Sequence, residues 1–249
     1  MEKLTSRKNE YIRRLRFLAS DRDCRAAHGE FVCDGLKLLK EALCFNAEVT
    51  SVLWKKSAED FRGLDGAAQY IADSELFDYA SPMKNSPGPL FTVKIPAQDL
   101  SSPVKNALIL ESVQDPGNVG TVIRAANAFG VGAVILVGDC ADLHNPKTVR
   151  STMGAIFRQR VLTLDMHQLT ELLEKNSLPL YGAALHRDSA LLTAVDVKNA
   201  AVAVGSEGRG LSDSLLSMCG RTVFIPMQPE SESLNAAVAA SIIMWEMQR

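Results

Sequence analysis

The feature that most constrains the fold is a series of short, almost wholly apolar runs between helix-like segments in the second part of the chain. These runs lie at 107–110, 133–137, 178–184, 201–205 and 222–226. Short apolar runs that alternate with helices are typical of a mostly parallel sheet covered on both faces. We therefore predict an α/β domain whose chemistry lies in the loops that follow the carboxyl ends of its strands.

The first part of the chain alternates helix and strand on a smaller scale. Apolar spacing predicts a helix over 6–20 with Ser6 as its N-cap, and a second helix that Asp34 caps. We expect strands at 30–33, 48–54, 68–72 and 90–95 and a helix at 73–80. A polar stretch with prolines follows. The predicted organisation is a small α/β domain over 1–95, a linker at 96–103 and a larger α/β domain over 104–249.

The charge of the chain is unevenly distributed. The 249 residues carry 27 basic and 29 acidic side chains, and a net charge of −2 does not suggest a nucleic-acid partner. Residues 1–25, however, hold eight lysines and arginines against four acids, a net charge of +4. Basic charge is therefore concentrated at the N-terminal end.

Several classes of protein are disfavoured by what the sequence lacks. No apolar run approaches the roughly 18 residues of a membrane span, and the N-terminus shows no apolar signal segment. The five cysteines form no CxxC pair, and the four histidines form no HxxxH pair. We expect a cytoplasmic protein with reduced cysteines, no membrane contact and no metal.

The first candidate loop follows the apolar run at 107–110. Gly117 and Gly120 permit a tight turn, and a helix N-terminus near Asn118 is a ready site for an anion. Arg124 lies six residues further on, less than two helical turns away. The alternative interpretation is an ordinary strand-to-helix turn with a surface arginine.

The second candidate loop, 205–210, holds three glycines in six residues and a single acid, Glu207. Its G-x-x-G-x-G order is not that of a dinucleotide-binding loop, and it lacks the ending of a phosphate-binding P-loop. Such a loop can wrap a small ligand with backbone amides and carbonyls. The alternative is a flexible turn into a helix that Ser212 or Asp213 caps.

The third candidate loop runs from 224 to 235. Ser233 or Asn235 can cap the alanine-rich helix that follows. The apolar residues near the C-terminus, 242–247, are expected to form a packing surface within the chain or with a partner. The alternative is merely a capped C-terminal helix.

In this order, the three loops resemble the SpoU–TrmH family, the RNA ribose 2'-O-methyltransferases of the SPOUT superfamily. The matching motifs are Asn118-x-Gly120-x-x-x-Arg124, then Gly205-Ser206-Glu207-Gly208-x-Gly210, then Ile225-Pro226-Met227 and Ser233-Leu234-Asn235. The resemblance covers about 101–249. A segment at 150–155 is also similar to the family, and residues 4–95 look like its N-terminal substrate-binding domain.

The resemblance implies a SPOUT α/β domain with a deep trefoil knot, S-adenosylmethionine as the cofactor, and a homodimer whose site lies at the interface. The implied cofactor-binding residues are Gly205, Glu207, Gly208, Ile225, Met227 and Leu234. The implied catalytic residues are Asn118, Arg124, Glu207, Ser233 and Asn235, with Arg124 supplied by the opposite subunit.

The implied partner is structured RNA, with ribosomal RNA favoured over transfer RNA because of the N-terminal domain. The expected RNA-binding residues are Arg7, Lys8, Arg13, Arg14 and Arg25. A solvated helix face remains the alternative for the arginines of the first helix.

The expected chemistry is an in-line transfer of a methyl group to a ribose 2'-hydroxyl, which the protein must align and help to deprotonate. An arginine is always charged, so we expect Arg124 to bind the adjacent phosphate and to stabilise the developing alkoxide. The residue that takes the proton is left open. A cofactor-free RNA-binding or ribosome-assembly factor is the alternative function. A nucleotide-dependent oxidoreductase fails on glycine spacing.

Overall fold

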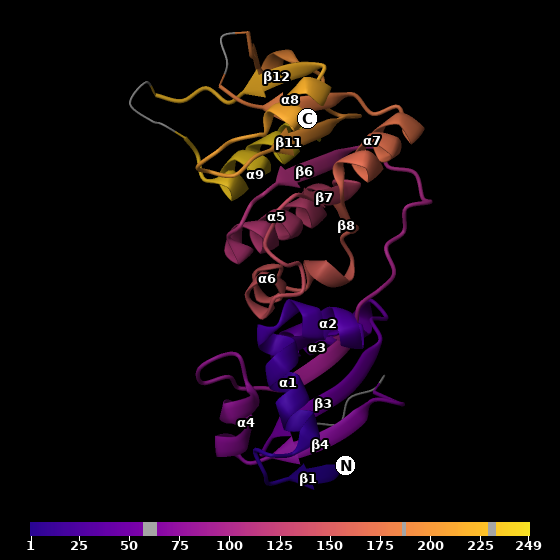
Figure 1. The fold of residues 1–249 in the computed structure, drawn as a ribbon, viewed down its shortest axis with the longest axis vertical. Helices are drawn as coiled ribbons and strands as arrows, with labels where there is room; N and C mark the ends of the chain where they lie inside the picture. The colour runs from indigo at the N-terminus through magenta and orange to yellow at the C-terminus, as the bar shows by residue number, and fades with distance from the viewer. Residues whose placement is uncertain (57–63, 186–187, 229–232) are drawn as a thin grey trace. The chain divides into compact units, whose positions relative to one another are not determined.

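The structure is a computed structural model that describes residues 1–56, 64–185, 188–228 and 233–249. It divides into two compact units, the first formed by residues 1–97 and 142–157 and the second by residues 98–141 and 158–249. Both units are α/β structures, as the alternation of the sequence predicts (Figure 1). None of the helices in the described residues is long and apolar enough to cross a bilayer.

Unit 1 is built on a mixed sheet whose described strands follow the order β1-β4-β3-β5-β2. The strands are β1 (Glu2–Leu4), β2 (Glu30–Asp34), β3 (Val49–Lys55), β4 (Ala68–Ala72) and β5 (Leu90–Lys94). The helices are α1 (Glu10–Ser20), α2 (Arg22–His28), α3 (Leu36–Cys44), α4 (Ser74–Ala80) and the short α6 (Pro146–Ser151). A 3-10 turn, η1 (Ala155–Phe157), closes the inserted segment. β5 runs antiparallel to both of its neighbours, β2 and β3.

Two apolar clusters stabilise unit 1, one on each face of its sheet. Ile12, Leu15 and Leu18 of α1 are fully buried in one of them, which is why the helix forms on this stripe. The other contains Leu39 of α3 and Val149 of α6. Residues 142–157, although distant in sequence, therefore contribute to the core of the N-terminal unit, an arrangement that no local pattern indicates.

Two expected helix caps in unit 1 were wrong. The first helix begins at Glu10, and Asn9 caps it by accepting hydrogen bonds from the amides of Tyr11 and Ile12. Ser6 instead closes a turn before the helix by accepting from the amide of Lys8. Asp34 does not cap α3, because its carboxylate accepts hydrogen bonds from two serines of a later loop, so Gly35 occupies the cap without a side-chain bond.

Unit 2 contains the parallel sheet that the apolar runs predict. Its strands follow the order β10-β12-β9-β11-β6-β7-β8, and every pairing recorded among them is parallel. The strands are β6 (Ala107–Glu111), β7 (Ala133–Val137), β8 (Val161–Leu164), β9 (Leu180–Ala183), β10 (Ala190–Leu191), β11 (Ala201–Val204) and β12 (Arg221–Phe224). Every residue of β6 and β7 is buried, which requires cover on both faces.

The helices of unit 2 provide that cover. They are α5 (Pro116–Phe129), α7 (Met166–Lys175), α8 (Asp213–Met218) and α9 (Ala236–Glu246), with a 3-10 turn at η2 (Leu192–Ala194). Leucines of α7 and α8 pack in one cluster with alternate residues of the strands. α5 and α9 lie side by side and also contact β7 and β11 (Figure 1).

The stretch expected to be a linker is held along unit 2. The guanidinium group of Arg160 donates hydrogen bonds to the carbonyl oxygens of Asp99 at 2.6 Å and Ser102 at 3.1 Å. The ammonium group of Lys175 donates to the carbonyl oxygens of Leu100 and Ser101. Because these bonds involve the backbone, residues 99–102 are held against unit 2 although their side chains are exposed.

Candidate active site

Three helix or strand ends bring the polar residues of the candidate loops together at one edge of unit 2. Asn118 lies in the first turn of α5, which begins at Pro116 and is capped by Asp115, so a helix starts near Asn118 as expected. Glu207 follows the carboxyl end of β11. Asn235 caps α9, and its side-chain oxygen accepts from the amides of two residues in the first helical turn.

Glu207 is the centre of a small hydrogen-bonded ring. Its Oε1 accepts from Nδ2 of Asn118 at 2.7 Å, from Nδ2 of Asn235 at 2.8 Å and from the backbone amide of Ala236 at 3.2 Å. Nδ2 of Asn235 also donates to Oδ1 of Asn118 at 3.1 Å. A carboxylate at the N-terminus of α9 is favoured by the helix dipole. The structure therefore joins three residues that the resemblance implies as catalytic. Asn118 is 89 residues from Glu207 and 117 residues from Asn235 in the sequence.

The other two residues implied as catalytic lie differently. Ser233 is exposed, and it lines the pocket described next. Arg124 is exposed on α5, and within the described residues of the single chain it forms no hydrogen bond or ion pair. Its guanidinium is therefore available to a ligand or to another molecule.

A pocket opens beside the ring, between the ends of β9, β11 and β12 and the start of α9. It measures about 770 Å³, counting space that is open to solvent. Five of the six residues implied as cofactor-binding line it: Gly205, Glu207, Ile225, Met227 and Leu234. Gly208 is exposed and is not part of the lining. Residues 229–232 of the third loop lie outside the described residues, so nothing is concluded about them.

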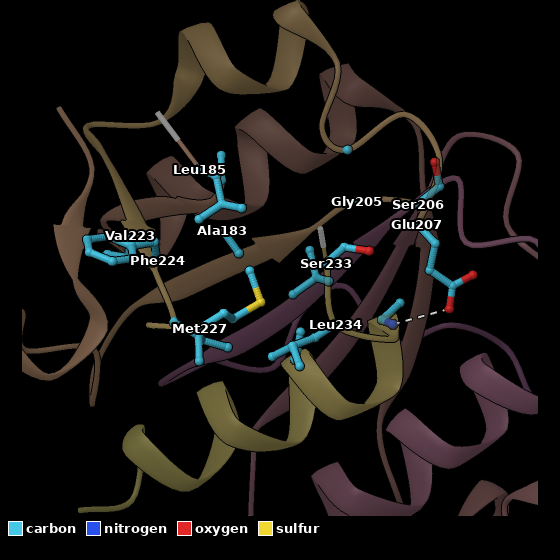
Figure 2. Close-up of a pocket in the computed structure, with 16 residues that line it drawn as sticks. Ala183, Leu185, Gly205, Ser206, Glu207, Val223, Phe224, Met227, Ser233 and Leu234 are labelled. Atoms are coloured by element: carbon cyan, nitrogen blue, oxygen red, sulfur yellow. Dashed lines mark hydrogen bonds between the residues drawn. The ribbon is translucent and has the colours of Figure 1, made fainter. Parts of the chain in front are cut away.

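Much of the pocket wall comes from residues that the motifs do not include. Ala183 ends β9, Ala184 and Leu185 follow it, and Val223 and Phe224 end β12. Figure 2 shows Leu185 and Met227 from two different segments beside the same space. Their signal in the sequence is position alone, because they occupy carboxyl ends of strands in a parallel sheet. The wall is largely apolar, and Glu207 and two serines, Ser206 and Ser233, supply side-chain polar groups.

Gly205 is required by a close passage of the backbone. A Cβ atom at this position would lie 2.1 Å from the carbonyl carbon and oxygen of Gly210 and 2.5 Å from the amide nitrogen of Leu211. The loop returns on itself there, and the amide of Gly210 donates to the carbonyl oxygen of Ser206 at 2.8 Å. Only a residue without a side chain fits this geometry, so the loop presents backbone groups to the pocket.

Glu111 anchors the far end of the same loop, a role that the sequence does not reveal. Glu111 is the last residue of β6 and is only 7% exposed. One of its carboxylate oxygens accepts from the backbone amide of Ser212 at 2.7 Å, and the other accepts from the Ser212 hydroxyl at 2.6 Å. Ser212 in turn caps α8 by accepting from the amide of Leu215. The loop between Gly205 and Ser212 is thus tied at one end by Glu207 and at the other by Glu111.

The basic residues of the N-terminal segment are largely engaged within unit 1. The guanidinium of Arg7 binds Glu75 at 2.6 Å and lies over the ring of Tyr79, 4.8 Å from its centre. Arg14 lies near Glu30 and over the ring of Tyr11. Arg13 and Lys8 are exposed.

Arg25 corrects the expected set of RNA-binding residues. Its side chain is only 4% exposed; it forms an ion pair with Asp142 and donates to the carbonyl oxygen of Leu18 at 2.6 Å. A buried guanidinium with these partners joins the inserted segment to α1 and α2. It is not accessible to a polyanion, so Arg25 is not carried into the RNA-binding set.

The described residues contain no group of three or more histidine, cysteine or acidic side chains that could hold a metal ion. His186, one of the four histidines, lies outside them. No cysteine or histidine lines the described pocket. The site can therefore bind and orient a small, partly apolar ligand, and it offers one carboxylate and neutral amide and hydroxyl groups.

Comparison with known proteins places this geometry in context. Residues 105–245 match the family described as the SpoU rRNA Methylase family. The chain is 29% identical over 248 residues to the 23S rRNA (guanosine(2553)-2'-O)-methyltransferase RlmP of Bacillus subtilis, with 99% of each protein covered. It is 32% identical over 263 residues to an uncharacterized tRNA/rRNA methyltransferase of Synechocystis, with 99% of this chain and 93% of that protein covered.

A solved structure is similar over almost the whole chain. This is the crystal structure of the SpoU methyltransferase AviRb from Streptomyces viridochromogenes in complex with the cofactor AdoMet, with a TM-score of 0.85 and 26% sequence identity. The match covers 96% of this chain and 98% of that one. The likeness therefore extends over both units of the chain.

Proposed function

Since the chain belongs to the SpoU rRNA Methylase family, we propose that it transfers a methyl group from S-adenosylmethionine to a ribose 2'-hydroxyl of RNA. Ribosomal RNA is favoured over transfer RNA, because the full-length relative in Bacillus subtilis is a 23S rRNA methyltransferase. The observation that carries the proposal is the ring of Asn118, Glu207 and Asn235 beside a pocket lined by the family's cofactor motifs.

The residues of the pocket fit S-adenosylmethionine. The backbone of Gly205, Ile225 and Leu234 can bind its polar atoms, and the apolar wall suits the adenine ring. The close passage at Gly205 leaves no room for a side chain, so backbone groups can approach a ligand closely. When bound, S-adenosylmethionine supplies a methyl group that its positive sulfur already activates.

The remaining residues orient the hydroxyl group that receives the methyl group. Asn118, Glu207 and Asn235 form a rigid polar wall, because each is held by at least two hydrogen bonds. Ser233 adds a hydroxyl at the mouth of the pocket. Arg124, which is always protonated, binds the adjacent phosphate and stabilises the negative charge that develops on the 2'-oxygen.

A homodimer with Arg124 contributed by the opposite subunit belongs to the same proposal. Val238, Ile242 and Trp245 occupy one exposed face of α9, with exposed fractions of 48%, 38% and 59%. The ring of Trp245 packs edge-on against Phe129 of α5, 6.0 Å between centres, so this apolar face adjoins the helix that carries Arg124. A second copy covering it would bury the apolar side chains and bring in Arg124. Ile242→Glu should yield a monomer by light scattering and lose activity.

The proposal includes the finer features of the family. We expect the chain around the pocket to form a deep trefoil knot. Residues 1–95 serve as the substrate-binding domain and residues 104–249 as the methyltransferase domain, joined at 96–103. Lys8 and Arg13 remain candidates for RNA contact, with Arg7 and Arg14 partly engaged by acids and rings. No metal takes part, and the protein acts in the cytoplasm.

Two measurements test the proposed function. Calorimetric titration should show S-adenosylmethionine binding, and tritium from its methyl group should enter protein-free ribosomal RNA as alkali-resistant dinucleotides, the mark of a 2'-O-methyl group. Arg124→Ala should abolish the transfer and leave cofactor binding largely unchanged. Absence of cofactor binding in the wild type would favour the cofactor-free assembly factor instead.

A further inference from the structure

Three exposed cations of unit 1, Lys37, Lys84 and Arg150, lack the aromatic and acidic partners that hold the N-terminal arginines. Arg7 and Arg16 both lie over the ring of Tyr79, at 4.8 and 4.0 Å, and Arg16 also donates to the carbonyl oxygen of that tyrosine. Lys37 and Lys84, by contrast, are exposed and form no hydrogen bond or ion pair with any described residue.

The loop 81–89, which carries Lys84, is held in place by Asp34. The hydroxyl groups of Ser81 and Ser86 both donate to the Asp34 carboxylate, the first at 2.9 Å. The amide of Gly88 donates to the Ser86 hydroxyl at 3.0 Å. The loop is therefore anchored at both ends by one carboxylate at the end of β2, and Lys84 lies between the anchors.

Arg150 lies against the same loop. One guanidinium nitrogen, Nη1, is 3.2 Å from the sulfur of Met83, the residue before Lys84. Among the described residues no other acceptor takes a hydrogen bond from Arg150, whose side chain is exposed. A thioether sulfur is a weak acceptor, so most of the donor capacity of this guanidinium remains unused.

Lys37 completes the group. It follows Asp34 by three residues and lies in the first turn of α3. The two carboxylate oxygens of Asp34, which hold the loop, are both taken by serines. Lys55, the other cation near the loop, is balanced by Asp78 at 2.6 Å. None of Lys37, Lys84 and Arg150 forms an ion pair with a described residue, so no direct acid partner neutralises their charges.

We propose that the surface formed by Lys37, Lys84 and Arg150, here called the loop-81 surface, binds phosphate groups of the RNA substrate. The inference rests on the proposed function and adds a place of contact to it. Ammonium and guanidinium groups without protein partners lose little on binding phosphate, and a guanidinium can bind it with two parallel hydrogen bonds. Such contacts position an RNA without reading its sequence.

Arg150 comes from a part of the sequence that is distant from Lys37 and Lys84. Arg150 lies in the last turn of α6, in the segment between β7 and β8 of the methyltransferase sequence, yet it belongs to unit 1. The substrate-binding surface is thus built from both halves of the chain. A residue range of 1–95 taken alone would lack its guanidinium.

The test compares two triple variants of the full chain that remove the same charge. The first is Lys37→Gln with Lys84→Gln and Arg150→Gln. The matched control is Lys3→Gln with Arg22→Gln and Lys94→Gln, three exposed cations on other elements of unit 1. The probe is protein-free ribosomal RNA, and its dissociation constant is measured by filter binding from 50 to 200 mM salt.

We expect the loop-81 triple to weaken RNA binding about 10-fold or more and to lower the salt slope by about 2 to 3, about 1 for each lost phosphate contact. The KM for RNA should rise while kcat and the affinity for S-adenosylmethionine stay near the wild-type values. The control triple should bind within about threefold of the wild type.

Three results would overturn the inference. One is a loop-81 triple that matches the wild type while the wild type binds and methylates RNA, an outcome that leaves the proposed function intact. Another is a control triple that weakens binding as much as the loop-81 triple. The third is a wild type that binds neither RNA nor S-adenosylmethionine, which would remove the proposed function as well. Unchanged cofactor affinity in each variant verifies that unit 2 is folded.

Discussion

The two units differ in how their functional residues come to be placed. In unit 2, Asn118 and Asn235 lie at helix starts and Glu207 lies in the loop after a buried strand, so each position follows from local structure. In unit 1, the roles of Arg7 and Arg25 depend on partners far away in the sequence, Glu75 and Asp142. Sites built on strand ends can therefore be predicted from patterns, whereas a charged surface cannot.

The largest expected effect tests the local side of this comparison. Gly205→Ala would place a methyl carbon 2.1 Å from the backbone of Gly210, and neither backbone segment can yield without moving the loop. A displacement of about 1 Å in a positioned site costs about 100-fold in function, and the strain also lowers the free energy of unfolding. We expect S-adenosylmethionine binding to fall below detection by calorimetry and the melting temperature to drop.

The matched control is Gly208→Ala, three residues along the same loop. A Cβ atom there meets nothing within 4 Å, so its melting temperature should stay near that of the wild type. Equal losses of melting temperature in the two variants would mean that the loop, rather than the close passage at Gly205, is sensitive to any substitution.

The next largest effect is expected from breaking the long-range contact between Arg25 and Asp142 in unit 1. Arg25→Ala leaves Asp142 as an unpaired carboxylate whose side chain is only 17% exposed. Breaking a buried ion pair by removing one partner costs about 3 kcal/mol or more. Urea unfolding can follow unit 1 through the fluorescence of Trp54, which is 2% exposed, in a Trp245→Phe background.

The control for Arg25 is the double variant with Asp142→Ala. Because it leaves no charge unpaired, it should be less destabilised than the sum of the two single variants. Strict additivity would mean that the two side chains contribute independently, and that the inserted segment is not joined to unit 1 through this pair.

The predictability of the fold follows the same division. The run at 133–137 matches β7 residue for residue, because a buried parallel strand needs an uninterrupted apolar sequence. β10 has two residues and leaves no such pattern. The placement of 142–157 in unit 1 depends on tertiary contacts of Val149 and Asp142, which no periodicity records.

The candidate site divides in a similar way. The residues themselves indicated that the loops carry function, and the family resemblance indicated which side chains matter. Glu111 could not be found in either way, because a glutamate at the end of an apolar run has no distinguishing neighbours in sequence. Its role appears only when β6 and the start of α8 are seen together.

A smaller effect concerns pH and again unit 1. Burial lowers the pKa of His144 from 6.5 to about 4, with Asp142 opposing and Arg25 adding to the shift. The ring lies 4.7 Å from that of Phe31. Between these pH values the unfolded chain binds a proton that the folded chain does not, so stability falls as the pH falls from 7. The expected loss at pH 5 is about 2 kcal/mol.

His144→Asn isolates this contribution. The difference in unfolding free energy between pH 7 and pH 5, followed through Trp54, should shrink by about 2 kcal/mol in the variant. A variant that keeps the full pH dependence of the wild type would show that groups other than His144 cause it.

The smallest expected effect concerns Ser212 of unit 2, whose side chain makes both a local and a long-range hydrogen bond. Ser212 was expected as a cap from its position, but its bond to Glu111 is a long-range contact. Ser212→Ala should cost about 1 kcal/mol through the cap and leave one oxygen of the buried carboxylate without its hydroxyl partner. Because the same bond anchors the loop from Gly205, affinity for S-adenosylmethionine should fall several-fold. Ser212→Thr, which keeps the hydroxyl, should restore both. Lost stability with unchanged cofactor affinity would confine the role of Ser212 to the helix and separate Glu111 from the pocket.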